Sequence, residues 1–458
     1  MRQYDFNQSG KQPKKVEQRN FSAPRKIGLM GCWGFGNMGN LAHQIAMIQN
    51  IRKYQPNAQL YGFSVYPEIT QKIHGMPCFT FYRHPNNQWW QGKSFLTRGL
   101  NKFSTNIRRI SNPVLRKLLI PIRVPVEIIL EILAVVRSFK VLKGFDMLII
   151  TGGGHFDDVY GGARVLPYAL CVWASIAKLR KVDFLVVSNG VGPINERLSK
   201  FFFKQVLSSA SYRSYRDDYS KEYAERILNL HVTHDPVYPD LAHSLDLTAY
   251  QNSFQPKNEQ RTIVGIAPIP FDDESTFPGF SGEYTSAYLS YLSKLASFIS
   301  WLLENQYVVF FFFADKGDRQ AIQDLKRVLD KSKISYSEEQ ITEQPPPTNS
   351  ETTFDNYMTQ LAKTDLVIAS RFHGVLLAQL LNKPTLALSF AKKTDCLMAD
   401  TNQADYCLSI NHFDVETIKE KFIALEENQA LIKRQLANRT QQYREALAQQ
   451  YVYLFGHR

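Results

Sequence analysis

Short buried strands alternate with helical runs along most of this chain, and that alternation limits the fold more than any other feature. In the first half, strand-like runs are expected at Lys26–Met30, Leu60–Val65, Met147–Thr151, Phe184–Ser188 and Arg213–Tyr215. Helical patterns fall between them, at Leu41–Tyr54, Pro167–Leu179, Glu196–Ser209 and Asp217–Ile227. Such a βαβ series predicts a parallel, doubly wound sheet covered by helices.

The same alternation restarts after a polar stretch. Strands are expected at Thr262–Ala267, Val308–Phe313, Ile334–Ser337, Leu366–Ala369 and Thr385–Leu388. Helices are expected at Tyr284–Asn305, Lys316–Leu329, Phe354–Lys363 and Phe372–Asn382. At 458 residues the chain exceeds one core, so we predict two Rossmann-like domains. The predicted divisions are a disordered polar tail at 1–24, an N-terminal domain at 25–247, a linker at 248–260, a C-terminal domain at 261–412 and C-terminal helices at 413–458.

A basic insertion interrupts the first domain at 93–143. It holds eleven Lys or Arg residues and two acids, Glu127 and Glu131, so most of the net charge of +12 lies there. Its second half, Leu118–Val136, is strongly apolar, but prolines and charges interrupt it too often for a membrane-spanning helix. A basic, apolar segment is suited to peripheral contact with an anionic membrane surface. The alternative is a helical insertion packed on its own domain with a solvated basic face.

Composition narrows the remaining classes. The hydrophobic fraction of 44% is typical of a soluble globular protein. The five cysteines lie far apart without a CxxC pair, which disfavours a zinc ribbon or a disulfide framework and suits a reducing cytosol. The polar N-terminal residues do not resemble a signal peptide. No nucleic-acid-binding motif accompanies the positive charge, so no nucleic-acid partner is expected.

The stretch Asp365–His373 carries the clearest chemical signal. A strand-like run ends at Ser370, which is expected to be the N-cap of a helix, with Arg371 at its first position and His373 at its third. A helix start beside an arginine favours anion binding, and a nearby histidine can deliver a proton. This predicts a phosphate-bearing substrate and acid chemistry; the alternative is a surface arginine and a packing histidine.

A glycine-rich loop follows the first strand. Gly34, Gly36 and Gly39 satisfy the spacing G-x-G-x-x-G, with Asn37 and Asn40 between and after them. A dinucleotide site also requires an acid at the end of the second strand, and none stands there, so a nicotinamide enzyme is disfavoured. The loop is expected to approach another ligand; the alternative is a tight structural turn.

Two further glycine clusters follow strands of the same domain: Gly152–Gly154, and Gly190 with Gly192. Ligands of parallel sheets bind outside the carboxyl ends of the strands, so three glycine-rich ends there predict room for a bulky acceptor. His155, Asp157 and Asp158 could supply acid–base groups or hydrogen bonds to a sugar, or be solvated loop residues. No metal-ligand spacing is present, and no metal is expected.

Arg216 and Asp217 form a corner after the strand Arg213–Tyr215. Asp217 is the natural N-cap of the next helix, which leaves Arg216 as the candidate for function.

Taken in order, these motifs resemble the polysaccharide pyruvyl transferase family. The resemblance rests on the Gly36–Asn40 loop, the Gly152–Gly154 turn, the Asn189–Pro193 stretch, the Tyr215–Asp217 corner, Pro239–Asp240, and Ser370–His373 with Pro384 and Lys393 behind it. It spans roughly residues 26–410 and implies a fold similar to GT-B glycosyltransferases, with two Rossmann-like domains facing across a cleft. It also implies transfer of a pyruvyl group from phosphoenolpyruvate to two hydroxyls of one sugar, as a cyclic ketal.

The resemblance assigns a role to each candidate residue. Arg371 and His373 would be catalytic, with Arg371 binding the donor and His373 the general acid. Ser370, Arg216 and Lys393 would bind the donor. The acceptor would contact the glycine-rich ends: Gly36, Asn37, Gly39, Asn40, Gly153, Gly154, Asp157 and Gly190. Phosphoenolpyruvate would be a co-substrate, with no cofactor. The acceptor would be a polysaccharide sugar or a lipid-linked oligosaccharide, used in the cytoplasm or at the inner membrane face.

One departure from the family's pattern concerns the first loop, which usually ends in Gly-Asp and here ends in Gly39-Asn40. This departure implies a different acceptor or a different base. Two alternatives stay open at this stage: a GT-B-like glycosyltransferase that uses a nucleotide sugar, and a non-catalytic relative that binds glycan or phosphate.

Overall fold

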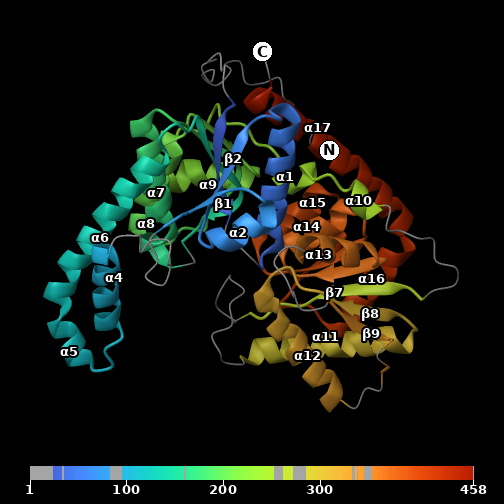
Figure 1. The fold of residues 1–458 in the computed structure, drawn as a ribbon. Helices are drawn as coiled ribbons and strands as arrows, with labels where there is room; N and C mark the ends of the chain where they lie inside the picture. Colours follow the sequence, from blue (N-terminus) through green and yellow to red (C-terminus); the bar gives the residue numbers. More distant parts are fainter. Residues whose placement is uncertain are drawn as a thin grey trace. The chain divides into compact units, whose positions relative to one another are not determined.

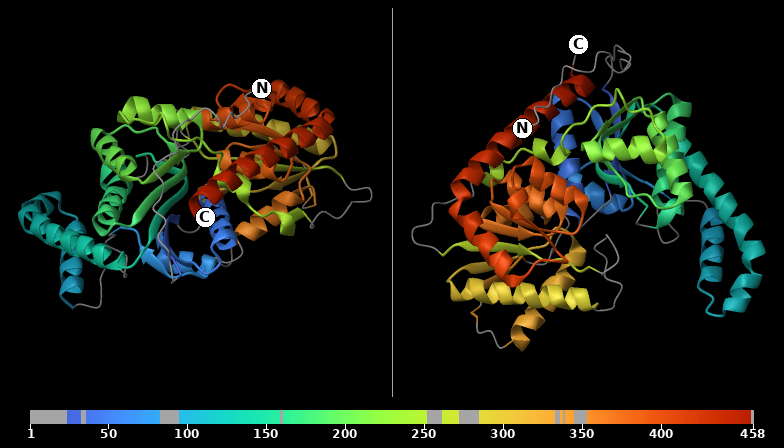
Figure 2. Two further views of the ribbon diagram at one scale, coloured as in Figure 1. Left: turned by 90° about the horizontal axis from the view of Figure 1, so that it is seen from above. Right: turned by 180° about the vertical axis from the view of Figure 1, so that it is seen from behind.

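The computed structural model describes residues 24–32, 36–82, 95–158, 161–251, 261–271, 285–332, 336–337, 339–344 and 353–456. The predicted tail at 1–24 therefore falls almost entirely outside the described residues. The chain folds into two compact units. One comprises 1–34 and 51–240, and the other comprises 35–50 and 241–458. Figure 1 shows a twisted sheet within each unit, and Figure 2 gives two further views of the same ribbon.

The first unit contains a six-stranded parallel sheet in the order β3-β2-β1-β4-β5-β6. Its strands are β1 (Lys26–Cys32), β2 (Gln59–Ser64), β3 (Cys78–Thr80), β4 (Met147–Phe156), β5 (Asp183–Val191) and β6 (Tyr212–Tyr215). The order reverses between β1 and β4, which is the switch point of a doubly wound sheet. The core beneath it joins residues of several strands and helices, among them Phe63, Trp173 and Phe203.

The helices of the first unit include one long excursion from the sheet. They are α2 (Pro67–His74), α4 (Phe95–Arg108), α5 (Pro113–Leu118), α6 (Ile120–Val141), η1 (Gly162–Arg164), α7 (Leu166–Arg180), α8 (Arg197–Ser209) and α9 (Asp218–Leu228). Helices α4, α5 and α6 form the predicted insertion, and both figures show them extending away from the sheet of this unit. Within the described residues, no helix combines the length and apolar character needed to cross a membrane.

The second unit repeats the same topology. Its six parallel strands lie in the order β12-β11-β10-β7-β8-β9. They are β7 (Ile263–Ala267), β8 (Val308–Phe311), β9 (Ile341–Glu343), β10 (Leu366–Ala369), β11 (Thr385–Ser389) and β12 (Cys407–Ser409). The switch point here lies between β7 and β10. The prediction of two doubly wound α/β domains is therefore confirmed.

Helices cover this second sheet, and two of them extend the chain beyond it. They are η2 (Leu241–Ser244), α10 (Thr248–Gln251), α11 (Ser286–Glu304), η3 (Lys316–Asp318), α12 (Arg319–Lys331), α13 (Thr353–Ala362), α14 (Phe372–Leu380), α15 (Lys392–Asp400), η4 (Ala404–Tyr406), α16 (Val415–Glu427) and α17 (Gln429–Phe455). The predicted C-terminal helical extension corresponds to α16 and α17. The last of these packs against η2 and α14.

Helix α1 (Met38–Tyr54) crosses the division between the units, because residues 35–50 belong to the second one. Hydrogen bonds within that unit explain the assignment. The Met38 N–H donates to the Ala314 carbonyl oxygen at 2.8 Å, and Asn50 Nδ2 donates to Ser244 Oγ at 3.2 Å. The Gly36–Asn40 loop, expected in the first domain, therefore belongs with the second.

Two local predictions differ from the structure. The third strand of the second sheet is β9, whereas Tyr336 and Ser337 are not in a strand and Ile334 lies outside the described residues. Pairing with β8, rather than the weak local pattern, fixes its place (Val309 opposite Ile341). The predicted linker at 248–260 begins instead with α10; a turn precedes this helix, in which Asp246 Oδ1 accepts hydrogen bonds from Thr248. The rest of the linker, from 252, lies outside the described residues.

Candidate functional site

Helix α14 begins directly after β10, at the predicted strand–helix junction. Arg371, not Ser370, is its N-cap, with an extended backbone (φ −75°, ψ 138°) and no side-chain cap. Ser370 is buried at the end of the strand, so its hydroxyl lies inside the unit rather than over the first turn. The predicted N-cap at Ser370 was therefore wrong by one residue, and His373 takes the second helical position. Arg371 and His373 still lie together at the start of this helix.

Arg371 forms a bidentate ion pair with Asp318. Its Nε and Nη2 atoms donate to Asp318 Oδ2 and Oδ1, each at 2.6 Å. Asp318 is 1% exposed, and burial raises the pKa of its carboxyl to about 6, although Arg371 acts to lower it and Asp315 to raise it. Two parallel charge-assisted hydrogen bonds fix the plane of the guanidinium. The cation at this helix start is thus oriented and compensated by a buried carboxylate.

Asp318 is itself held by a turn that follows β8. Asp315 is the N-cap of η3 and accepts from the Gly317 N–H at 3.0 Å, while Asp318 Oδ2 accepts from the Asp315 N–H at 3.1 Å. This reciprocal capping box satisfies backbone donors at the helix start. It also fixes the position of the carboxylate that receives Arg371.

The glycine-rich loop is anchored to that same turn. Asn37 Nδ2 donates to Asp315 Oδ2 at 3.0 Å, and Asn37 Oδ1 accepts the Asn40 N–H at 3.0 Å. Gly36 has φ +114°, a backbone conformation that favours glycine. The Asn37 side chain therefore joins the start of α1 to the turn after β8. Both ends of its amide are used in hydrogen bonds that hold the loop in place.

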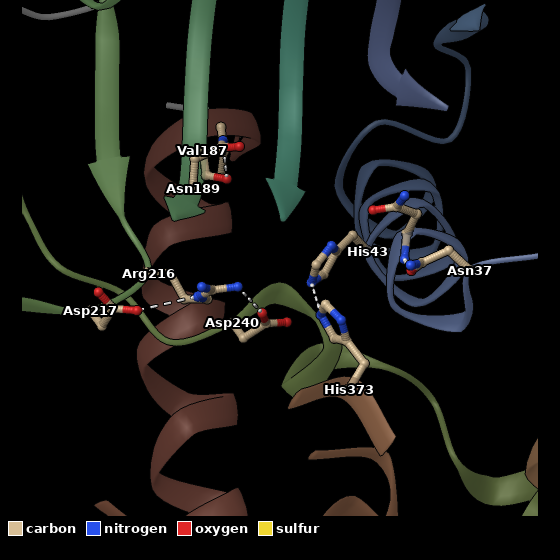
Figure 3. A network of polar contacts seen from close by, with 9 residues as sticks. Asn37, His43, Val187, Asn189, Arg216, Asp217, Asp240 and His373 are labelled. Carbon is tan, nitrogen blue, oxygen red and sulfur yellow. Dashed lines mark hydrogen bonds and ion pairs between the residues drawn. The ribbon is translucent and has the colours of Figure 1, made fainter. Parts of the chain in front are cut away.

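His373 faces a second histidine, His43, which lies on α1 one helical turn after Gly39. The two Nε2 atoms are 3.3 Å apart and the ring centroids 4.9 Å apart, in an edge-to-face arrangement. Figure 3 shows the two rings pointing toward each other. His43 is buried, and a hydrogen bond between the rings requires one Nε2 to carry a proton and the other to accept it.

Gly39 makes this arrangement sterically feasible. A Cβ atom at position 39 would lie 2.0 Å from His373 Nδ1. Any larger residue would displace the imidazole, so the glycine permits close packing of α1 against the His373 ring. Gly39 therefore lies directly against the His373 ring, whereas the contact of this loop with a ligand stays a prediction. Facing imidazole nitrogens are also the kind of ligand that divalent cations accept; independence from metal stays a prediction.

In the first unit, the predicted glycine clusters lie within the strands rather than after them, except for Gly192, which follows β5. Gly152–Gly154 belong to β4 and Gly190 to β5, and Gly153 pairs with Asn189 across the two. The strands continue because parallel pairing extends through the glycines. Asp157 follows β4 and is half-buried. Its neighbour Asp158 accepts from the Asn195 and Glu196 N–H groups ahead of α8, which explains Asp158 by structure alone.

Arg216 crosses the carboxyl end of β5 and is held by two carboxylates. Nε lies 3.3 Å from Asp217 Oδ2 and Nη1 lies 3.5 Å from Asp240 Oδ2, as Figure 3 shows. A Cβ at Gly190 would lie 2.7 Å from Arg216 Nη2, so this glycine makes space for the guanidinium. Asp217 also accepts the Ser220 N–H at 2.7 Å, which confirms it as the N-cap of α9.

Lys393 stands in the first turn of α15, after β11, and is half-buried. The structure therefore gathers Asn37, Gly39, Arg371 and His373 in the second unit, around two groups that the sequence analysis had not singled out. Those groups are His43 and Asp318. In the first unit it brings Gly190 to Arg216.

Comparison with protein families identifies the chain. The family model described as polysaccharide pyruvyl transferase matches residues 37–391. The chain belongs to the polysaccharide pyruvyl transferase family. The match includes His43, Asp318, Arg371 and His373, whereas Gly36 and Lys393 lie just outside it. Membership in this family makes the protein a transferase of the polysaccharide pyruvylation class.

Several solved structures resemble this chain at the level of the fold. A glycosyltransferase from Rickettsia africae has a TM-score of 0.52 at 8% identity, covering 94% of this chain and 98% of the other. A putative UDP-N-acetylglucosamine 2-epimerase from Listeria monocytogenes has a TM-score of 0.51 at 11% identity, covering 90% and 91%. The UDP-GlcNAc 2-epimerase from Methanocaldococcus jannaschii has a TM-score of 0.50 at 12% identity, covering 88% and 92%. These are proteins of the GT-B fold, and the likeness extends to the fold alone. A comparison with curated proteins finds no match.

Proposed function

We propose that this family member transfers a pyruvyl group from phosphoenolpyruvate to two hydroxyls of one sugar, in a cell-surface polysaccharide or its lipid-linked precursor. The donor, the acceptor and the reaction at the inner membrane face are parts of the proposal. Family membership supports the class of reaction. The observation that carries the donor assignment is the contact between His43 of α1 and His373, which lies with Arg371 at the start of α14.

The reaction requires one proton to be delivered and others to be removed. Protonation of the donor's methylene carbon makes its neighbour electrophilic, and one sugar hydroxyl adds there with loss of its proton. The second hydroxyl then displaces phosphate, which leaves with the bonding electrons and takes up a proton. The products are a cyclic ketal and inorganic phosphate. Such chemistry needs a positioned acid, a base and cations near the leaving group.

In this proposal the imidazole pair, rather than His373 alone, is the acid. A protonated His373 gives its proton to the donor carbon, and the neutral ring can then accept the proton of the attacking hydroxyl. His43, 3.3 Å away, stabilises either charge state by donating or accepting at Nε2. A pair that both gives and takes a proton does not require the aspartate that usually ends the family's first loop. Asn40 is therefore compatible with turnover.

Arg371 is proposed to bind the phosphate or carboxylate of the donor, in the orientation set by Asp318. Because the Asp318 carboxylate offsets the charge of Arg371, the pair is nearly neutral before substrate arrives. The negative group of phosphoenolpyruvate would therefore meet N–H groups of fixed direction rather than an unpaired cation. Arg216 and Lys393 are proposed as further anion contacts and Ser370 as a nearby polar group. The glycine-rich segments and Asp157 are proposed to receive the acceptor.

The direct test incubates the protein with phosphoenolpyruvate and a panel of β-galactoside, mannosamine and glucuronate acceptors. Acceptor-dependent phosphate release, a ketal product in the mass spectrum and loss of both in Arg371→Ala would support the proposal. A parallel assay supplies UDP-linked sugars. Turnover only in that second assay would replace the proposal with glycosyl transfer, and donor binding without turnover on any acceptor would favour a non-catalytic relative.

A further inference from the structure

Helix α6 presents its apolar face outward. Ile128, Ile132 and Val136, spaced by four residues, are 54%, 58% and 46% exposed. The residues two positions along from these, Leu130, Ala134 and Ser138, are the buried ones. Two positions on a helix correspond to roughly 200° of rotation, so the two rows lie on opposite faces. The outward row is accompanied by further exposed apolar side chains: Ile122, Val124, Ile129, Leu133 and Phe139.

The acids of this helix point the other way. Glu127 accepts hydrogen bonds from Ser104 and Arg108 of α4, the latter at 2.7 Å, and Glu131 accepts from Tyr168 of α7 at 3.1 Å. Both acids of the 93–143 insertion are therefore used in packing α6 against its neighbours. On an ordinary surface helix the charges face solvent and most large apolar side chains face the core, whereas on α6 both acids face neighbouring helices and most large apolar side chains face outward.

The neighbouring helix α5 adds cations to the same insertion. All six of its residues are exposed, including Val114, Leu115 and Leu118 together with Arg116 and Lys117. Lys140 and Lys143 are exposed at the other end of α6. Among the described residues from 99 to 143, the exposed charges are therefore all positive. The alternative of a solvated basic face does not describe α6, whose outward face is mainly apolar.

We propose that α5 and the outward face of α6 form a docking surface for an anionic lipid bilayer. A membrane interface accepts apolar side chains at the level of the acyl chains and cations at the level of the headgroups, which is the combination found here. Charge decides between this occupant and a second copy of the chain. Two copies would bring together two insertions that each carry eleven basic residues and two acids, and like charges oppose that contact.

The proposal does not depend on the pyruvyl transfer chemistry. It assigns the surface that would hold the protein at a membrane, whatever acceptor is used there. A lipid-linked acceptor would be reached by a protein lying on the bilayer, and none of the insertion's helices between 95 and 143 is able to cross it.

The test is co-sedimentation of the full-length protein with vesicles of phosphatidylcholine alone, or of phosphatidylcholine mixed with phosphatidylglycerol. Strong binding to the anionic vesicles and weak binding to the neutral ones is expected. Ile128→Ser, Ile132→Ser and Val136→Ser combined should lower binding at least tenfold. The matched control, Ile423→Ser, Leu431→Ser and Val452→Ser combined, replaces equally exposed apolar residues of α16 and α17 and should bind like the parent.

Charge is tested by Arg116→Glu with Lys117→Glu, which should also lower binding to anionic vesicles about tenfold. Every replaced side chain is exposed, so each variant is expected to fold, and circular dichroism checks that it does. The proposal is overturned if the parent does not bind anionic vesicles, or if the α6 variant binds as well as the parent. If the parent is a dimer that binds no vesicles, and the α6 substitutions dissociate that dimer, the outward face of α6 serves self-association instead.

Discussion

The buried Asp318 carboxylate and the partly exposed Arg371 guanidinium form a bidentate ion pair although 53 residues separate them in the sequence. The carboxylate comes from the turn after β8 and the guanidinium from the start of α14. The pair joins two segments that follow different strands of one sheet, and it sets the direction of the side chain proposed to meet the donor.

We expect Arg371→Met to destabilise the protein by roughly 3–5 kcal/mol, because it leaves the buried Asp318 carboxylate unpaired. Asp318→Leu should cost less, because the Arg371 side chain keeps some exposure to solvent. The double variant should recover much of that loss but no turnover. Urea denaturation and phosphate release measured on the same four proteins separate the two effects. Recovery of turnover in the double variant would show that Arg371 has only a structural role.

The pH dependence of stability should contain a contribution from Asp318. Its pKa is raised from 3.8 to about 6, mainly by burial. Between these two pH values the Asp318 carboxyl of the folded state therefore holds a proton that the unfolded chain has released. The contribution of this group to stability is therefore fully present below about pH 4 and is lost as the pH rises through about 6. Above that the contribution is constant.

Thermal unfolding of the parent and of Asp318→Asn, compared at several pH values, measures this effect. The melting temperature of the parent minus that of the variant should fall between about pH 4 and pH 6 and then stay level. A difference that is constant across the whole range would contradict the assignment. A difference that rises with pH would mean that Arg371 outweighs burial and depresses the pKa.

Gly39→Ala should impair catalysis more than folding. The new Cβ would lie 2.0 Å from His373 Nδ1, so the imidazole must move, and a displacement of about 1 Å can cost about a hundredfold in rate. Alanine is otherwise favourable in the first turn of α1. The control is Gly99→Ala in α4, where a Cβ meets nothing within 4 Å. A loss of rate shared by both variants would contradict the steric argument.

His43→Gln tests whether the imidazole pair acts as a unit. Glutamine can hydrogen-bond to His373 but does not titrate, so kcat should fall by roughly a hundredfold while KM for phosphoenolpyruvate changes little. His373→Ala should abolish turnover and leave donor binding measurable by calorimetry. If His43→Gln keeps the parental kcat and pH profile, His373 acts alone; if His373→Ala loses donor binding to the same extent as turnover, that residue is structural.

The fold was largely predictable because both faces of a parallel strand are buried, which leaves continuous apolar runs such as Val308–Phe311 and Leu366–Ala369 in the sequence. The edge strands β3 and β12 were missed because three residues carry no pattern. Arg371 and His373 were found because local signals mark the start of a helix.

Their partners were not found, for a physical reason. His43 lies 330 residues from His373, and no local rule connects them. Its spacing of four residues from Gly39 places both on one face of α1 and could have drawn attention to it. Asp318 lies in a polar stretch typical of a solvated helix start, and its burial depends on Arg371 arriving from another segment.

Residues 35–50 precede most of the first unit in the chain yet fold with the second. The proposed chemistry therefore does not map onto a contiguous half of the gene. A fragment that began at Leu241 would keep His373 but lack His43, Gly39 and the Asn37 contact to Asp315. Two relatives can exchange halves by recombination in nature or by chimera construction in the laboratory. Such an exchange would keep His43 and His373 from the same parent only if this sixteen-residue stretch were exchanged with the C-terminal half.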